Sequence, residues 1–284
     1  MPFEPPVESP THLRDALAIL ASEGSRPIAG GTDVMVQITG ELGPPPERML
    51  DLWHLQELRG MALTGNALSL GALTTYTEIR RSGRCREHAP ALVEAAATIG
   101  AAQIQNRGTL GGNIANASPA GDTLPVLLAM DAEIVVGSLR GERSIPAQAF
   151  WTGYRKTALA PDELILRVLL PIDPERRVRF RKVGTRRAQA ISKVVMALSW
   201  QDGSSAGWQD VRLALGSVAD RAIRAKETEA VLEGRPPTQE TADRAAASIA
   251  AEIHPIDDVR STADYRRAVT ARVLHRLIRD AGGW

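Results

Sequence analysis

The stretch at 104–122, IQNRGTLGGNIANASPAGD, combines closely spaced glycines with short polar side chains. Gly108, Gly111 and Gly112 lie close to the short polar residues Thr109 and Asn113, and the segment as a whole is poor in large side chains. Because glycine has no Cβ and reaches φ > 0 without strain, a Gly-Gly step lets consecutive backbone N–H groups converge on one point. Hydroxyl and amide side chains add hydrogen bonds of short, fixed reach. The combination favours an anionic, oxygen-rich ligand such as a diphosphate.

A second glycine pair stands in residues 27–36, PIAGGTDVMV. A short apolar strand at 27–29 precedes Gly30 and Gly31, and Thr32 and Asp33 then open another apolar run. A lone Gly-Gly pair is typical of a tight turn, but two such turns in one chain indicate a binding role. Neither pair has the glycine spacing of the Rossmann dinucleotide motif, and neither continues into the Gly-Lys-Ser/Thr of a Walker loop.

Reactive side chains of other kinds do not form recognisable sets. The only cysteine, Cys85, cannot form an internal disulfide, and alone it cannot hold an iron–sulfur cluster. No carboxylate pair is marked out by its setting, and the histidines are scattered without metal-like spacing. Any redox chemistry must therefore come from a bound cofactor. The histidines are His12, His54, His88, His254 and His275.

Composition is that of a globular protein of about two domains, with 284 residues, 44% hydrophobic and 24% charged. A net charge of +1 and the lack of a basic stripe interleaved with aromatics give no reason to expect a nucleic-acid partner. No long apolar run and no basic-plus-apolar leader are present, so we expect neither membrane insertion nor export, and a cytoplasmic location.

The elements that must position the glycine segments follow from the hydrophobic periodicity. A helix is expected after Thr11 as its N-cap and before Gly24, and strands are expected at 27–29 and 49–53, which makes a small βαβ-like unit of residues 1–54. Residues 40–48, GELGPPPER, form a proline-rich excursion.

A second unit, 55–174, holds the central glycine segment. Thr75 and Glu78 form a capping box, a helix is expected at 89–99, and the run 123–130 reads as a helix with Asp122 as its N-cap. The continuous apolar run 164–170 predicts an interior strand.

The boundary falls at 171–174, and residues 175–284 make a separate α+β domain. We expect a three-stranded antiparallel sheet, with strands near 178–183, 190–200 and 211–218 and a turn at 201–207. Helices follow at about 219–233, 238–253 and 262–280, the last of them capped by Ser261.

The segments AGGTD at 29–33 and IQNRGTLGGNIANASPAGDTLP at 104–125 resemble the flavin-binding signatures of the medium subunit of molybdenum hydroxylases, the xanthine dehydrogenase and carbon monoxide dehydrogenase family. Further segments agree, at 152–171, 180–194 and 227–234, so the resemblance covers essentially the whole chain. It implies an α+β fold with a two-part FAD-binding domain of the PCMH type, then the smaller C-terminal domain. One departure is Ala101-Ala102, where the family often has Gly-His.

The resemblance also implies which residues contact the cofactor, a non-covalent FAD. The first segment corresponds to a diphosphate and ribityl loop, and the second to a further diphosphate contact through backbone amides. Asp122 corresponds to a carboxylate on the adenosine part, and the alternative role for it is the helix N-cap. Ile99 packs near the cofactor and Ile165 lies beside the adenine. Lys182 lies beside the isoalloxazine, where a cation stabilises the reduced anionic form, whereas the strand pattern alone makes it a solvated residue. The implied contacts are Pro27, Ile28, Ala29, Gly30, Gly31, Thr32, Asp33, Val34, Ile99, Thr109, Leu110, Gly111, Gly112, Asn113, Asp122, Ile165 and Lys182.

The function that the resemblance implies is electron transfer within a three-part enzyme. A molybdenum cofactor in a large subunit oxidises the substrate, two-iron two-sulfur clusters in a small subunit carry the electrons, and FAD in this chain delivers them to NAD or another acceptor. A dimer of such heterotrimers is expected, and the form ASPAGD favours the xanthine dehydrogenase side of the family. Two alternatives stay open: a self-contained flavin-dependent oxidase, and a non-catalytic nucleotide-binding assembly module.

Overall fold

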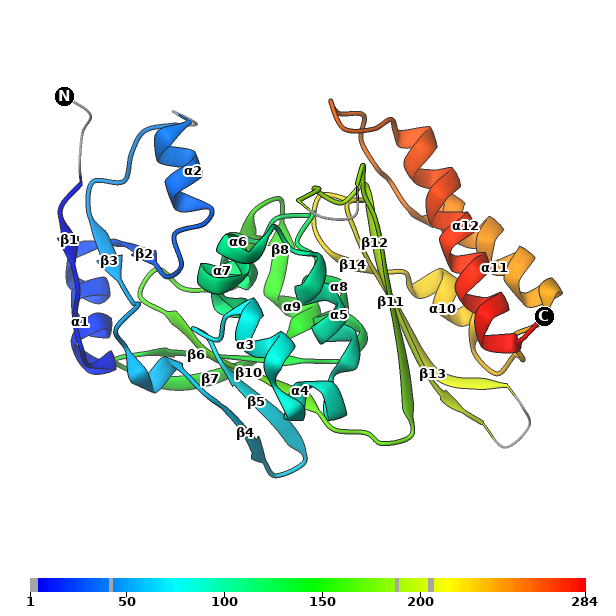
Figure 1. Ribbon diagram of the computed structural model, residues 1–284, viewed down its shortest axis with the longest axis horizontal. Coiled ribbons are helices and arrows are strands. Elements are labelled where there is room, and N and C mark those ends of the chain that lie inside the picture. Colours follow the sequence, from blue (N-terminus) through cyan, green and yellow to red (C-terminus); the bar gives the residue numbers. More distant parts are fainter. Residues whose placement is uncertain (1–4, 41–42, 187–188, 204–206) are drawn as a thin grey trace.

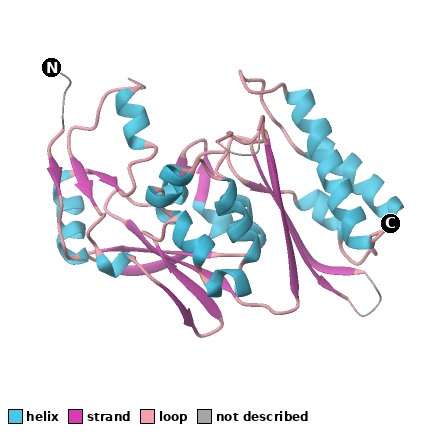
Figure 2. Ribbon diagram, viewed as in Figure 1, coloured by secondary structure: helices cyan, strands magenta, loops and turns pink. Residues whose placement is uncertain are grey.

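The computed structural model describes residues 5–40, 43–186, 189–203 and 207–284. Three sheets of three or more strands succeed one another along the described part of the chain, with the small N-terminal sheet at one end and the C-terminal sheet with its helices at the other (Figures 1 and 2). The expected turn at 201–207 and the excursion at 40–48 lie partly outside the described residues. No helix within the described ranges is both long and apolar enough to cross a bilayer.

The N-terminal unit is a three-stranded parallel sheet in the order β1-β3-β2. Helix α1 ends at Gly24, which has a φ of 61°, as expected, but its N-cap is His12 and not Thr11. The apolar run after the first glycine pair forms a short helix, so β2, α2 and β3 make a true βαβ unit. The elements are β1 (Val7–Glu8), α1 (Leu13–Glu23), β2 (Arg26–Ile28), α2 (Val34–Thr39) and β3 (Met49–Asp51).

The middle unit is built on a five-stranded antiparallel sheet in the order β4-β5-β10-β6-β7. Strand β10 pairs on both sides, which confirms the interior strand expected from the run 164–170. The strands are β4 (Met61–Thr64), β5 (Ala67–Gly71), β6 (Glu133–Ser138), β7 (Gly141–Pro146) and β10 (Leu164–Pro171), with a hairpin of β8 (Trp151–Gly153) and β9 (Lys156–Thr157).

Six short helices cover one face of this sheet, and two shorter elements connect its edges (Figure 1). The capping box of Thr75 and Glu78 begins α3 as expected. The helices are η1 (Gln56–Leu58), α3 (Tyr76–Arg81), α4 (Gly83–His88), α5 (Pro90–Thr98), α6 (Ala102–Arg107), α7 (Leu110–Asn116), α8 (Leu124–Ala129) and α9 (Ala147–Phe150).

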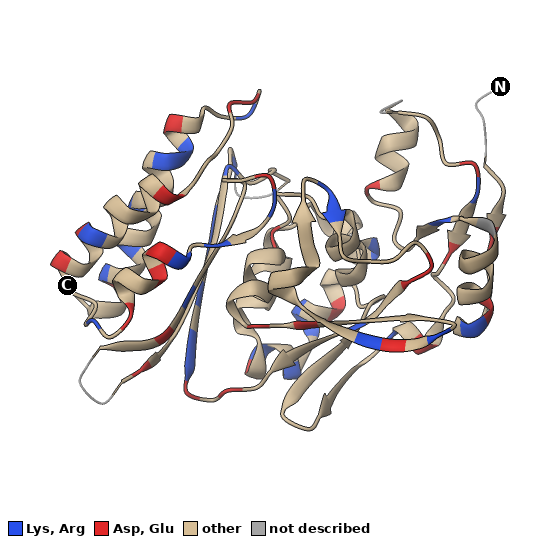
Figure 3. Cartoon of the chain, turned by 180° about the vertical axis from the view of Figure 1, so that it is seen from behind, with Lys and Arg blue, Asp and Glu red and all other residues tan. Residues whose placement is uncertain are grey.

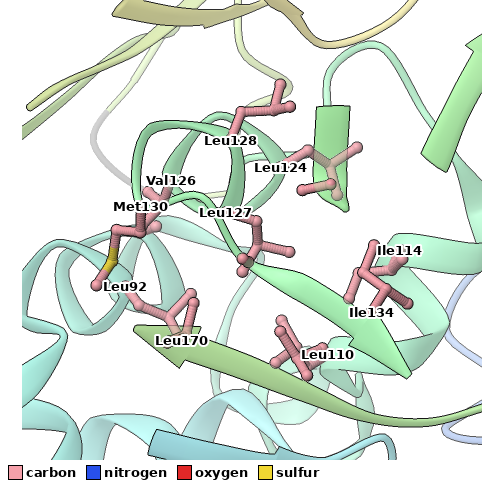
Figure 4. Close-up of a cluster of buried hydrophobic side chains, with 14 of the residues drawn as sticks. Leu92, Leu110, Ile114, Leu124, Val126, Leu127, Leu128, Met130, Ile134 and Leu170 are labelled. Atoms are coloured by element: carbon pink, nitrogen blue, oxygen red, sulfur yellow. The ribbon is translucent and has the colours of Figure 1, made fainter. Parts of the chain in front are cut away.

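The main core lies between these helices and the sheet. Leu110 and Ile114 of α7 point toward Ile134 of β6, and α8 packs against Leu92 of α5 (Figure 4). Burial of several leucine-sized side chains stabilises the arrangement by about 1.5–3 kcal/mol each. A second core under α1 includes Leu164 and Leu166 from β10, so the N-terminal unit packs onto the same sheet.

The C-terminal unit has a four-stranded antiparallel sheet, β11-β12-β13-β14, and not the expected three strands. The extra strand, β14 (Ile223–Arg224), is only two residues long and carries no alternating pattern that sequence could reveal. One face of the sheet packs on α5 and α8, and three C-terminal helices cover the other. The other elements are β11 (Arg176–Val183), β12 (Val194–Asp202), β13 (Trp208–Gly216), α10 (Lys226–Leu232), α11 (Gln239–Glu252) and α12 (Ala263–Gly282).

Two details of this unit differ from expectation. Thr262, not Ser261, caps α12 and accepts a hydrogen bond from the amide of Tyr265. Residues 219–225 precede α10, because they form a bend and then the two-residue strand β14, which pairs with β13. Strand β11 carries four arginines and Lys182, and blue patches run along it in Figure 3.

Candidate cofactor site

A cavity of about 490 Å³ lies where the first glycine segment meets the central one. Its wall includes the loop between β2 and α2, the start of α7, and the connection that leads into β10. Ligand sites of this size are common for cofactors, and this wall mixes backbone groups with apolar side chains.

The loop between β2 and α2 presents free backbone donors to the cavity. Gly31 has a φ of 75°, a conformation that glycine adopts without strain, and it turns the chain sharply after β2. Within the described residues, the amides of Gly30, Gly31, Thr32 and Asp33 make no hydrogen bond. Four consecutive N–H groups without partners at a cavity wall are suited to an anion.

The start of α7 differs from the open turn expected of the central segment. Gly111 and Gly112 lie in the first turn of a helix, and neither has a positive φ. Thr109 is the N-cap, and its hydroxyl oxygen accepts from the Gly112 amide at 3.1 Å. The amide of Leu110 donates to the carbonyl of Thr74. The convergence of free amides predicted here was wrong, because the carbonyls of Ala72 and Thr74 and the hydroxyl of Thr109 accept from those donors.

The two segments touch at Gly30. A Cβ built on Gly30 would lie 1.8 Å from the carbonyl oxygen of Arg107, so only glycine fits. The Arg107 guanidinium lies 3.8 Å from the ring centroid of Trp53, and the Arg59 guanidinium 4.6 Å from it. Arg59 also donates to the carbonyl of Trp53 at 2.7 Å. These cation–π contacts fix the α6–α7 connection against the N-terminal unit.

Polar side chains join the far end of α7 to the mouth of the cavity. Asn116 donates to the carboxylate of Asp33 at 3.0 Å and accepts from the guanidinium of Arg155 at 2.8 Å. Arg155 is exposed at the tip of the β8–β9 hairpin, with a φ of 51°. The network ties the first segment, α7 and the hairpin together.

Asp122 and Lys182 form a buried ion pair, with the Lys182 Nζ 2.6 Å from Asp122 Oδ2. Lys182 also donates to the carbonyl of Thr98 at 3.0 Å, next to Ile99. Burial raises the pKa of Asp122 to about 6, and the ammonium of Lys182 opposes that rise. Among the described residues, Asp122 Oδ1 has no hydrogen-bond partner. The Ser192 hydroxyl lies close enough to lower the pKa of the Asp122 carboxyl, and a buried carboxylate oxygen without a well-placed donor is unusual.

This pair corrects two alternatives drawn from the sequence. Asp122 is not the cap of α8, because that position belongs to Thr123. Lys182 is not a solvated strand residue, because its side chain is only 10% exposed and packs against α5. Neither residue lines the cavity itself.

The other residues that the resemblance implies as cofactor contacts either line the cavity or lie outside it. Leu110 points into the main core, and Ile99 lies beside the Lys182 contact without lining the cavity. The cavity wall also includes residues that the sequence did not single out, among them Ser25, Tyr76 and Glu163. The expected residues that do line the cavity are Pro27, Ile28, Ala29, Gly30, Gly31, Thr32, Asp33, Val34, Thr109, Gly111, Gly112, Asn113 and Ile165.

These residues fit a flavin dinucleotide. The free amides suit a diphosphate, and Ile165 with its apolar neighbours suits a planar base. Gly112 leaves room beside the cavity, since a Cβ there would meet only the Thr109 hydroxyl oxygen, at 2.9 Å.

Comparison with known proteins gives a consistent result. Residues 2–173 match the family model of the FAD binding domain in molybdopterin dehydrogenase, and residues 179–281 match that of the CO dehydrogenase flavoprotein C-terminal domain. The chain is 32% identical to the glyceraldehyde dehydrogenase medium chain of Sulfolobus acidocaldarius, over 94% of this chain and 95% of that protein. It is 30% identical to the xanthine dehydrogenase FAD-binding subunit of Escherichia coli O157:H7, over 95% of each.

The fold agrees with these sequence matches. The carbon monoxide dehydrogenase of Hydrogenophaga pseudoflava superposes with a TM-score of 0.92 at 28% identity, over 97% of this chain and 96% of the matched one. The expected fold class is confirmed, although the C-terminal sheet has one more strand than expected. Together, the two family models, the relatives of equal length and the cavity place this chain in the family of FAD-binding medium subunits of molybdenum-containing dehydrogenases.

Proposed function

We propose that this chain passes electrons from the iron–sulfur clusters of a partner subunit to NAD or another acceptor. The observation that carries the proposal is the cavity where both glycine segments meet, in a chain that matches flavoprotein subunits over their whole length. FAD supplies the chemistry, because it exchanges electrons singly or in pairs. The chain supplies binding, orientation and charge.

We propose that different residues bind different parts of the cofactor. We propose that the free amides of Gly30 to Asp33 hold the diphosphate and that Ile165 lies beside the adenine. We also propose that Asp122 and Lys182, whose side chains lie 2.6 Å apart, act on the same part of the cofactor, in place of the separate adenosine and isoalloxazine contacts that the resemblance implies. Beside the flavin ring, the Lys182 ammonium favours reduction of the cofactor by its positive charge.

The partners follow from the family and from one feature of the sequence. A single cysteine cannot ligate a cluster, so the metal centres belong to other chains. Relatives are named medium chains or FAD-binding subunits, in enzymes for substrates as different as glyceraldehyde and carbon monoxide. We propose a large subunit with the molybdenum cofactor, a small subunit with two-iron two-sulfur clusters, and a dimer of these heterotrimers.

We also propose how the chain divides into domains. We propose a FAD-binding domain of residues 1–174, with subdomains 1–54 and 55–174 that meet at the cavity, and a C-terminal domain of residues 175–284 that brings Lys182 to Asp122. We also propose a cytoplasmic complex, since the single cysteine is buried and unpaired.

The test compares the lone chain with the reconstituted complex in steady-state assays with purines and aldehydes. We expect no substrate oxidation by the lone chain, even when it is loaded with FAD, and turnover to NAD or a dye once both partner subunits are added. Omitting FAD should remove turnover to NAD while sparing reduction of dyes that accept electrons at the metal centres. Turnover of a purine or aldehyde by the lone chain would contradict the proposal and support the self-contained oxidase.

A further inference from the structure

Tyr76 is a buried aromatic residue in the cavity wall that lies outside both glycine segments. It is the first residue of α3, only 3% exposed, and its side chain lines the cavity. Its backbone amide donates to the carbonyl of Gly108 at 3.3 Å. The position of Tyr76 is therefore fixed by the central segment.

The ring of Tyr76 lies beneath the contact between the two glycine segments. A Cβ on Gly108 would come within 2.8 Å of the Tyr76 ring, and a Cβ on Gly30 would lie 3.0 Å from the Gly108 nitrogen. Thr75 and Thr109 form an isolated β-bridge beside it. Gly108 therefore lies between the Tyr76 ring and Gly30, which begins the loop with the free amides.

The hydroxyl of Tyr76 makes no hydrogen bond to any other residue that the structure describes. It is also not fully sealed from solvent, unlike the buried oxygen of Asp122. Since the side chain lines the cavity, the little surface that it keeps faces that space. Burial, together with the carboxylates of Asp33 and Asp122, raises the pKa of Tyr76, so the group stays a neutral donor.

A buried hydroxyl without an acceptor destabilises the protein unless a ligand or water satisfies it. The nearest built feature is the set of free amides at Gly30 to Asp33, which suits anionic oxygens. We infer that the Tyr76 hydroxyl donates a hydrogen bond to the diphosphate of the bound dinucleotide. This inference rests on the proposed function, and it adds a third element, α3, to the two glycine segments.

The test is Tyr76→Phe, which removes only the hydroxyl and keeps the ring under Gly108. We expect FAD to bind at least about 10-fold more weakly, as for a lost hydrogen bond to a charged acceptor. ADP, which contains the same diphosphate without the flavin, should lose a similar factor. Thermal unfolding of the FAD-free variant should occur at the same or a higher temperature, because an unsatisfied hydroxyl is gone. A merely structural hydroxyl would instead lower that temperature.

Tyr265→Phe is the matched control, because Tyr265 is 43% exposed on α12 and does not line the cavity. Fluorescence titration of all three proteins with FAD and ADP gives the answer. Unchanged affinity of Tyr76→Phe for FAD, or a loss for FAD without a loss for ADP, would overturn the inference. Failure of the wild-type chain to bind FAD would instead overturn the proposed function on which it rests.

Discussion

Replacing Gly30 with alanine tests the contact between the two glycine segments. The new Cβ would lie 1.8 Å from the carbonyl oxygen of Arg107, whereas ordinary contact begins at 3.4 Å. One of the two backbones must therefore retreat by roughly 1.6 Å. Neither partner is a flexible side chain, and the Arg107 guanidinium is held on Trp53.

The expected size of the effect follows from that displacement. Overpacking of a fixed site destabilises a fold by about 1–3 kcal/mol, and we expect a loss in this range for the FAD-free protein. The shift also moves the free amides away from the diphosphate that they hold, so FAD affinity should fall by about 10-fold or more, which is 1.4 kcal/mol.

Equilibrium unfolding in urea and fluorescence titration with FAD measure the two effects. Gly83→Ala is the matched control, because Gly83 is the first residue of α4 and a Cβ there meets no atom within 4 Å. We expect that control to be neutral or up to about 1 kcal/mol more stable, since alanine is the better helix residue. Wild-type stability and wild-type FAD affinity in Gly30→Ala would refute the reasoning.

Three further substitutions probe other parts of the site. Gly112→Val should abolish FAD binding, because Gly112 lines the cavity and a β-branched side chain would occupy space that the diphosphate needs; full flavin loading would count against this. The cost to the fold should be about 1 kcal/mol, because the new Cβ would lie 2.9 Å from the Thr109 hydroxyl oxygen that caps α7. The free energy of unfolding of the wild type should fall by about 3 kcal/mol as the pH rises from about 4 to about 6, because burial raises the pKa of Asp122 to about 6 and the unfolded chain releases that proton at lower pH. Asp122→Asn should lack this fall when both proteins are unfolded in urea across the same pH range. Identical pH profiles for the two proteins would contradict this prediction. Lys182→Met should make the midpoint potential of the bound flavin more negative, because the reduced flavin loses a nearby positive charge. The shift, measured by spectroelectrochemical titration, should be roughly 30 mV for each 1.4 kcal/mol by which the reduced form is destabilised. An unchanged potential would place Lys182 away from the flavin ring.

Elements with strong patterns could be predicted from the sequence. The run at 164–170 is apolar on both faces, and only an interior strand buries both, so β10 was confirmed. The capping box of Thr75 and Glu78 is a local pattern, and it was confirmed because both of its hydrogen bonds lie within one turn. Gly24 ends α1 for a similarly local reason.

Features set by tertiary contacts could not be predicted in the same way. Gly111 and Gly112 have poor helix propensity, yet α7 forms there because Thr109 caps it and Leu110 and Ile114 enter the core. Asp122 resembles a helix cap in sequence, and only the fold brings Lys182 within 2.6 Å of it.

The candidate site shows the same division between local and distant information. Both glycine segments were visible in the sequence because their small residues are contiguous. Tyr76 was not visible, since its place in the wall depends on a β-bridge between Thr75 and Thr109. The free amides of the first loop were not distinguishable from the occupied ones of α7 before the hydrogen bonds were known.

The most direct test of the central claim is a count of FAD per chain after reconstitution and desalting. Absorbance of the flavin against protein concentration gives the ratio, and acid denaturation followed by filtration shows whether the flavin is released. We predict one FAD for each wild-type chain, all of it released by acid, and none on Gly112→Val. A wild-type chain that retains no flavin, or one that keeps its flavin after denaturation, would contradict the account.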